Sequence, residues 1–420
     1  MKPKINPTRH LSLFNPDHFE DSPIHIVGDN RVARQTAYLL AKLGCAQVII
    51  WGSNAEAMQE IVAYVEHFAP IQITVRQRSD ISSDISGVVM VVETSLTERI
   101  NLYQNCLEMA SEVLQVLDVR TYNGDLPKVV TVPAMELFAQ SSLYEAKDQV
   151  SWDYAIACPL RSRIAATYLV GQFVVWSQIA YKMSGKEDRL LLAEQLIAPM
   201  EGLDAPSIGR IELLTPEHAS LPLHVIGVGA TGSHLVALLA ECGFRNISVY
   251  DFDAIESHNV ANQWFGPQQI DLPKIQALFQ NINKFFGFGI TPRSERIGKK
   301  SSPLTGIVFL LTDKMESRKE IADAFLNRPE VPCIVETRMS AELSQIYIAT
   351  QKDYATWRST LFDTEVYKPE VSACGTSITI STTAKLCVVI AVSEFIDYLT
   401  GGHVSPSNTT SFYPPHMSAI

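Results

Sequence analysis

The sequence predicts an α/β protein made of two tandem Rossmann-like domains, which are related by internal duplication and form a pseudo-dimer within one chain. A glycine-rich turn joins an apolar strand to a helix at Gly227, as in nucleotide-binding α/β domains. The stretch 24–52 repeats the apolar framework of 223–251, and the strand that begins at Gly87 repeats the one that begins at Gly306. Because strands that alternate with helices form parallel sheets, we expect two related sheets.

The glycine-rich turn lies in HVIGVGATGSHLVALLAECGFRNISVYDFD, from His224 onward. Gly227 allows a tight strand-to-helix turn, Gly229 lets a phosphate approach the backbone, and Gly232 lets helix and strand pack closely. The helix N-terminus supplies free N–H groups and a partial positive charge for an anion. Asp251, at the end of the second strand, stands where a carboxylate accepts hydrogen bonds from ribose hydroxyls. The segment therefore predicts a nucleotide site.

A series of polar residues follows this turn, which a dinucleotide-dependent dehydrogenase would not need. The series comprises Asp251, Asp253, Asn259, Gln263, Lys274, the pair Thr312-Asp313 at the end of the strand IVFLLTD, and Arg318. In this order the residues resemble the ubiquitin-activating-enzyme superfamily, which includes the ThiF/MoeB-like bacterial adenylyltransferases of thiamine and molybdopterin synthesis. The resemblance covers residues 222–402.

The resemblance implies an activating enzyme that uses ATP and Mg²⁺ to adenylate the C-terminal glycine carboxylate of a ubiquitin-like protein. The three glycines would cradle the phosphates, Asp251 would hold the ribose, and Asp313 would bind Mg²⁺. Lys274 and Asn262 would contact the phosphates, and the nucleotide site would also include Asp253, Asn259 and Gln263. Asn262 stands where the family has an arginine and can offer only a neutral hydrogen bond. We expect Lys274 and another basic residue to compensate.

A second step is expected at Cys374. This cysteine follows a polar stretch, 352–373, that reads as a loop, and it precedes a long helical run whose N-terminus would favour the thiolate. In the thiamine-pathway relatives the reactive cysteine lies 20 residues before a glutamate, and Cys374 lies 20 residues before Glu394. The resemblance thus implies that Cys374 takes the partner as a thioester for a conjugating enzyme. The absence of CxxC spacing predicts no structural zinc.

The first copy keeps the apolar framework and loses the polar positions. Asn30 and Ala33 replace the second and third glycines, Gly52 replaces Asp251, and Thr94 replaces Asp313. We therefore expect an inactive half at 1–185, a linker at 186–221, an active half at 222–402 and a flexible tail at 403–420. In the family, the partner domain lends an arginine to the nucleotide, and Arg9 is the position that would match. Cys158 is the inert counterpart of Cys374.

Composition excludes several classes. With 46% hydrophobic and 19% charged residues the chain is an ordinary globular protein, and its net charge of −11 argues against nonspecific nucleic-acid binding. The longest apolar run, 168–181, is too short to span a bilayer. With no secretion signal and no disulfide pattern, we expect a cytoplasmic protein. The layout suggests a bacterial antiviral conjugation operon, and the chain could form a further homodimer.

Three alternatives remain open. An activator of a sulfur-carrier protein would share the adenylation chemistry, although the fused inactive half favours conjugation. A nicotinamide-dependent oxidoreductase would explain the glycines and Asp251 but leaves Lys274, Asp313 and Cys374 without roles. A binding scaffold without turnover would explain Asn262.

Overall fold

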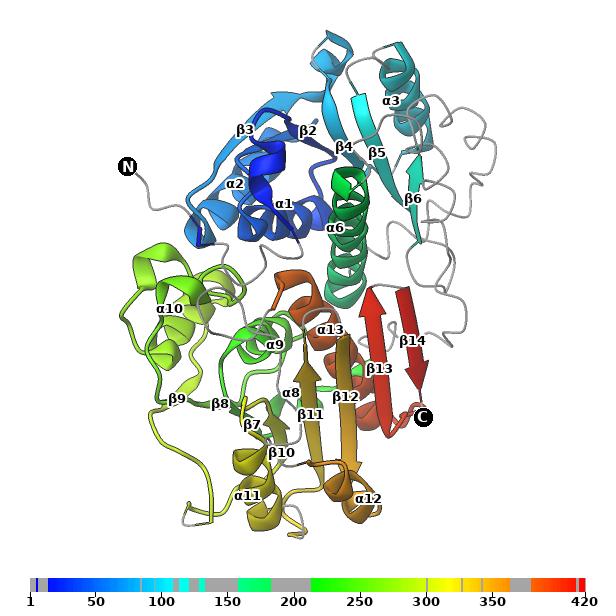
Figure 1. The fold of residues 1–420 in the computed structure, drawn as a ribbon. Helices are drawn as coiled ribbons and strands as arrows, with labels where there is room; N and C mark the ends of the chain where they lie inside the picture. Colours follow the sequence, from blue (N-terminus) through cyan, green and yellow to red (C-terminus); the bar gives the residue numbers. More distant parts are fainter. Residues whose placement is uncertain are drawn as a thin grey trace. The chain divides into compact units, whose positions relative to one another are not determined.

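The structure is a computed structural model, and the chain divides into two compact units, Met1–Glu201 and Gly202–Ile420, each of which is described by itself (Figure 1). The division falls within the segment 186–221 that was expected to be a linker. The residues described are 5–6, 14–83, 85–93, 95–108, 113–120, 128–132, 158–182, 213–299, 301–325, 328–340, 343–362, 379–412 and 415–419.

The first unit contains a six-stranded sheet in the order β3-β2-β1-β4-β5-β6, in which only β6 is antiparallel to its neighbour. Its strands are β1 (Ile24–Val27), β2 (Gln47–Gly52), β3 (Gln72–Gln77), β4 (Gly87–Val91), β5 (Val113–Arg120) and β6 (Lys128–Val132). Its helices are α1 (Arg31–Leu43), α2 (Ala55–Phe68), α3 (Leu96–Glu108) and α6 (Pro159–Lys182), with 3₁₀ turns η1 (Pro16–Phe19) and η2 (Arg78–Ser83).

The second unit contains an eight-stranded sheet in the order β14-β13-β12-β11-β10-β7-β8-β9, parallel from β9 to β11 and antiparallel from there to β14. Its strands are β7 (Leu223–Ile226), β8 (Ile247–Tyr250), β9 (Thr291–Arg293), β10 (Ile307–Leu310), β11 (Cys333–Met339), β12 (Leu343–Thr350), β13 (Ser407–Phe412) and β14 (Pro415–Ala419). Its helices are α8 (Pro216–Ser220), α9 (Ala230–Glu241), α10 (Lys274–Phe286), α11 (Met315–Phe325), α12 (Tyr354–Ser359) and α13 (Ser381–Thr400), with 3₁₀ turns η6 (Ser257–Asn259) and η7 (Pro267–Gln269).

The first sheet and the part of the second sheet formed by β7 to β12 share one topology, as the internal duplication predicts. The chain order reverses between β1 and β4 in the first sheet and between β7 and β10 in the second, which is where α/β sheets of this kind bind ligands. Helix α6 packs on α1 and β5, and α13 packs in the same way on α9 and β11. The turn after the first strand also agrees. The N–H of Gly28 donates to Trp51 at 2.8 Å, and that of Gly227 donates to Tyr250 at 2.9 Å.

The C-terminal segment 403–420, expected to be a flexible tail, instead adds two strands to the second sheet. The expectation was wrong because the inward side chains of β13 are polar. Asn408 and Thr410 are each only 1% exposed, and the Thr410 hydroxyl lies 2.5 Å from that of Ser344 on β12. A strand whose buried face carries Asn and Thr lacks the apolar alternation from which half-buried strands are recognised.

The polar stretch 352–373, read as a loop, begins with the short helix α12. The rest of this stretch beyond residue 362 lies outside the described residues, as do Cys374, Arg9 and Thr94. Within the described ranges, no helix has both the length and the apolar character needed to cross a membrane.

Candidate functional site

The turn between β7 and α9 depends on two of its three glycines for its shape. Gly227 has a φ of +94°, and a Cβ added there would lie 2.9 Å from the carbonyl oxygen of Leu311 on the neighbouring strand end. A Cβ at Gly232 would lie 2.0 Å from the carbonyl oxygen of Gly227. These two positions therefore accept only glycine, because the backbones of strand, turn and helix approach one another too closely for a side chain.

Gly229 has a different surrounding. A Cβ added there would meet nothing within 4 Å, so the turn leaves open space at this point. Gly229 is also the N-cap of α9, which has no side-chain cap and no acidic residue in its first turn. An uncapped helix N-terminus with open space beside it suits an anionic group, because N–H groups and the helix dipole both point at it.

Asp251 closes one side of this turn. Its Oδ2 accepts the Val228 N–H at 2.8 Å and its Oδ1 accepts the Asp253 N–H at 2.9 Å. Each carboxylate oxygen has a second lone pair, so both can also accept a ligand hydroxyl. The next acidic residue, Asp253, accepts a hydrogen bond from Lys274 Nζ at 2.8 Å, and the Lys274 N–H donates to the Asp253 carbonyl at 3.0 Å. Lys274 is 7% exposed, so this pair holds its ammonium group in place.

The segment between Asp253 and Lys274 is buried. Asn259 Oδ1 accepts the Glu256 N–H at 3.0 Å and shapes the turn η6. Asn262 is fully buried, its Nδ2 donates to the Thr379 hydroxyl just before α13, and its carbonyl lies 3.2 Å from His234 Nε2. Thr379 was not expected from the sequence, because it lies 117 residues from Asn262.

Two buried acceptors here lack a partner among the described residues: Asn262 Oδ1 and Gln263 Oε1. Buried acceptors are normally satisfied, so these two oxygens are open to a hydrogen-bond donor from a bound group or a water. The residues present therefore fit a polar ligand.

Strand β10 pairs with β7, and the residues that follow it, Thr312 and Asp313, complete the site. Asp313 is exposed there, and the carbonyl of Thr312 accepts hydrogen bonds from Arg318, including one from Nε at 2.8 Å. Within the described ranges, no three His, Cys, Asp or Glu side chains gather as metal ligands. Asp313 is therefore a lone carboxylate that could hold a cation together with oxygens of a ligand.

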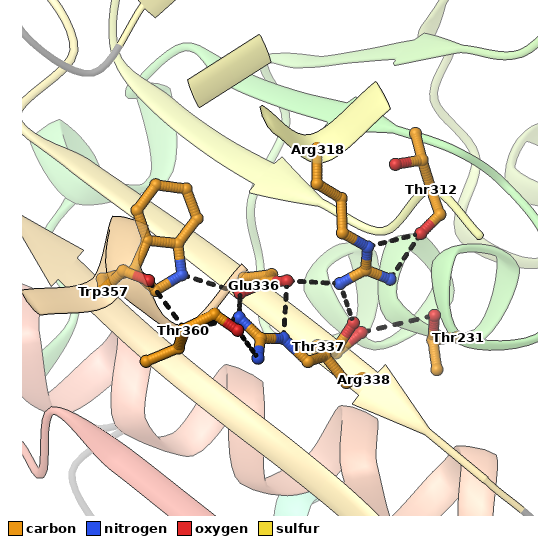
Figure 2. A network of polar contacts seen from close by, with 8 residues as sticks. All are labelled: Thr231, Thr312, Arg318, Glu336, Thr337, Arg338, Trp357 and Thr360. Atoms are coloured by element: carbon orange, nitrogen blue, oxygen red, sulfur yellow. Dashed lines mark hydrogen bonds and ion pairs between the residues drawn. The ribbon is translucent and has the colours of Figure 1, made fainter. Parts of the chain in front are cut away.

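A buried polar network adjoins Thr312, the residue before Asp313, and of its members the sequence indicated only Thr312 and Arg318 (Figure 2). Glu336, on β11, is fully buried and lies between the guanidinium groups of Arg318 and Arg338. The Trp357 indole N–H also donates to it, at 2.7 Å. Burial opposes ionisation of Glu336, but the two guanidinium groups outweigh it and keep its pKa below the ordinary value.

The corresponding turn of the first unit is filled by the protein's own side chains. Asn30 Oδ1 accepts the N–H groups of Val32 and Ala33, so α1 is capped where α9 is not. Asp29 accepts two backbone N–H groups after β2, and a Cβ at Gly52 would lie 2.7 Å from the Asp29 carboxylate. The carboxylate thus lies on the opposite strand from Asp251, and no open helix end remains.

Five of the six cysteines inside the described ranges are poor nucleophiles. Burial raises the pKa of Cys106, Cys333 and Cys387 to about 12, and it also raises that of Cys45 and Cys158. Only Cys242 is partly exposed among them. Because the thiolate is the reactive form, none of the five buried thiols suits covalent chemistry.

The second unit is therefore an α/β domain with an open helix N-terminus, the carboxylate of Asp251 after β8 and the exposed Asp313 after β10, at a topological switch point. Residues 219–418 match the ThiF family, so the second unit contains a ThiF-family domain.

The chain is also similar to ubiquitin-like modifier-activating enzymes over short stretches. It is 28% identical over 117 residues to ubiquitin-like modifier-activating enzyme 5 of Xenopus laevis, covering 24% of this chain and 30% of that protein. It is 34% identical over 102 residues to the NEDD8-activating enzyme E1 catalytic subunit of Arabidopsis thaliana, covering 23% and 22%. The chain spans less than a third of the length of these relatives.

Proposed function

We propose that the second unit uses ATP to adenylate the C-terminal carboxylate of a ubiquitin-like protein. The observation that carries this proposal is the uncapped N-terminus of α9 at Gly229, which opens between Asp251 and the strand end with Asp313 in a ThiF-family domain. In the first unit, where Asn30 caps the equivalent helix, the same fold offers no such opening.

The residues would divide the nucleotide between them. Backbone N–H groups at the start of α9 would bind phosphate oxygens, and Asp251 would accept the ribose hydroxyls. Lys274, held by Asp253, would supply positive charge to the phosphates. Because Asn262 is neutral and its Nδ2 is engaged by Thr379, it adds no such charge. A Mg²⁺ ion bound by Asp313 would offset charge on the leaving pyrophosphate.

The reaction would be a displacement at phosphorus. A carboxylate oxygen of the partner's terminal glycine attacks the α-phosphorus, the bond from that phosphorus to the bridging oxygen breaks, and pyrophosphate leaves. The attacking carboxylate oxygen then links the partner's carboxyl carbon to the phosphorus of AMP as a mixed anhydride. The relatives named above activate ubiquitin-like modifiers and NEDD8, which supports a protein substrate.

A thioester would follow on Cys374. Its thiolate would attack the acyl carbon, AMP would leave, and a conjugating enzyme would take the partner from the sulfur. The raised pKa values of the buried thiols, Cys333 and Cys387 among them, favour a nucleophile elsewhere in the chain. The first unit would serve as the inactive half of a pseudo-dimer and lend Arg9 to the nucleotide.

The test is intact-mass spectrometry of the protein with Mg-ATP and a ubiquitin-like protein that ends in glycine. The wild type should gain one partner mass in a thiol-sensitive adduct, which Asp313→Ala and Cys374→Ala should both lose. Cys158→Ala is the matched control and should keep the adduct, because its thiol is buried.

Other outcomes reassign the chemistry. An adduct that survives Cys374→Ala places the thioester on another residue. A thiocarboxylate on the partner, without an enzyme adduct, assigns sulfur transfer. Neither adduct nor pyrophosphate release with any such partner refutes the proposal and leaves a binding scaffold.

A further inference from the structure

The loop that carries Asp313 is held from behind by one guanidinium group. Arg318 donates to the Thr312 carbonyl through Nε at 2.8 Å and also through Nη2. The same side chain donates through Nη1 to Glu336 Oε1 at 2.6 Å and to the Thr337 carbonyl at 2.7 Å. Arg318 is 6% exposed, so its position is set by these partners rather than by solvent. The backbone just before Asp313 is thereby tied to β11.

Glu336 in turn has every acceptor position matched to a donor (Figure 2). Oε1 accepts from Arg318 Nη1 and from Arg338 Nε at 2.9 Å. Oε2 accepts from Arg338 Nη2 at 2.9 Å and from Trp357 Nε1 at 2.7 Å. Four donors converge on two oxygens, so both must be acceptors. A glutamine has one acceptor oxygen and one NH₂ group, so it would leave two of these donors without a partner.

The first unit contains an equivalent buried carboxylate–arginine pair at the same strand register. Leu310 pairs with Glu336 across β10 and β11, and the equivalent residue Val91 pairs with Asp118 across β4 and β5. Arg99, the counterpart of Arg318, is fully buried and forms an ion pair with Asp118.

Arg99 also holds the same backbone. Its Nε donates to the Glu93 carbonyl at 2.5 Å, at the position equivalent to Thr312. Its Nη2 donates to the carbonyl of Val119, the residue after Asp118. The pair is thus common to both units, but only in the second does the next residue, Asp313 rather than Thr94, carry a carboxylate.

We propose that Glu336 is a positioning residue for metal binding, acting through Arg318 and the Thr312 carbonyl to fix the loop that presents Asp313. This inference rests on the proposed function, in which Asp313 binds Mg²⁺. The buried pair would keep the Asp313 backbone from shifting, because a carboxylate contributes to a metal site only when its surroundings orient it.

The test measures ATP binding by calorimetry across a series of MgCl₂ concentrations. In Glu336→Gln, the Mg²⁺ concentration for half-maximal enhancement of ATP binding should rise by up to roughly 10-fold, the lower end of the effect of losing a direct partner of a metal ligand, because Glu336 acts only through Arg318 and the Thr312 carbonyl. ATP affinity without Mg²⁺ should stay at the wild-type value. Glu336→Asp should recover part of the Mg²⁺ response, because an aspartate serves at this register in the first unit.

Asp118→Asn is the matched control, since it breaks the equivalent buried pair in the unit without the carboxylate. It should lower stability in urea as Glu336→Gln does, yet leave the Mg²⁺ response unchanged. Should Glu336→Gln fail to fold, Arg318→Lys provides the second variant, because a point charge cannot reach Thr312 and Glu336 together. Its Mg²⁺ response should be weakened in the same way.

The outcomes separate the two proposals. A wild type that does not bind Mg-ATP refutes the proposed function and this inference with it. A wild type that binds, beside a Glu336→Gln protein with an unchanged Mg²⁺ response, refutes only the positioning role. An equal shift in Asp118→Asn would also overturn it, because the effect would then reflect general loss of stability.

Discussion

Replacing Gly229 and Gly232 by alanine, one at a time, separates the binding role of the turn from its structural role. A Cβ at Gly229 meets no atom within 4 Å, so the cost to the fold comes only from the backbone, whose φ of −79° and ψ of −142° alanine rarely adopts. The free energy of unfolding of Gly229→Ala should therefore fall by about 1–3 kcal/mol. A Cβ at Gly232 would lie 2.0 Å from the Gly227 carbonyl oxygen, so that variant should lose more stability than Gly229→Ala, because the backbone itself must move.

Gly229→Ala, the variant that loses less stability, should lose affinity for ATP. The methyl group of Gly229→Ala would stand where a phosphate approaches the α9 N-terminus and would cost at least one charge-assisted hydrogen bond, worth about 1.5–3 kcal/mol. This corresponds to a loss of roughly 10- to 100-fold in affinity. Urea unfolding followed by tryptophan fluorescence and calorimetry with Mg-ATP measure the two effects. A folded Gly229→Ala protein with wild-type affinity would show that phosphate does not bind at this helix end.

Three further outcomes are expected. Burial raises the pKa of Glu394 from 4.5 to about 7, so the folded state binds this proton more tightly than the unfolded state. The free energy of unfolding should therefore fall as pH rises between these values, by about 3 kcal/mol at most. Urea unfolding of Glu394→Gln should lack this fall, and a variant with the same pH profile as the wild type would contradict the assignment. Deletion of 405–420 removes β13, β14 and the Ser405 N–H that donates to Glu394 at 3.1 Å, so the melting temperature should drop, whereas a disordered tail would have no effect. Native Cys333 and Cys387 should resist iodoacetamide until urea is added, and fast labelling would show that they are accessible.

The sequence was sufficient to predict the parts of the candidate site that directly follow strand ends. The three glycines, Asp251 and the Thr312-Asp313 pair follow strand ends, and parallel strands bring such ends to one edge of a sheet. The duplication was likewise visible, because the two apolar frameworks align residue by residue. Arg318 was recognised as part of the polar series, but its buried partner Glu336 was not.

The remaining features depend on contacts between distant segments. The pairing of β10 with β11 brings Glu336 to Arg318. Trp357 donates to Glu336 from helix α12, which follows strand β12. Asn262 and Thr379 meet across 117 residues. Polar residues at such positions have no periodic pattern, and their burial becomes visible only when the packing is known. The strands β13 and β14 were missed for the same reason.

The positions of Asp251 and Asp29 suggest why the turn after β7 in the second unit is open to a ligand and the turn after β1 in the first unit is filled. Asp251 reaches from β8 to the N–H after β7, whereas Asp29 reaches from the end of β1 to two N–H groups after β2. The two arrangements exclude each other within one turn, because a Cβ at Gly52 would lie 2.7 Å from the Asp29 side chain.

Gly52→Asp alone should therefore destabilise the first unit by overpacking, by about 1–3 kcal/mol. Asp29→Val alone should lose two hydrogen bonds, about 0.5–1.5 kcal/mol each. In the double variant the new Asp at position 52 could accept the N–H of residue 29, as Asp251 accepts that of Val228, so the two losses should not add. Urea unfolding of the four proteins gives the coupling energy. Additive losses would mean that the two carboxylates do not compete for one place, and that the closed turn has another cause.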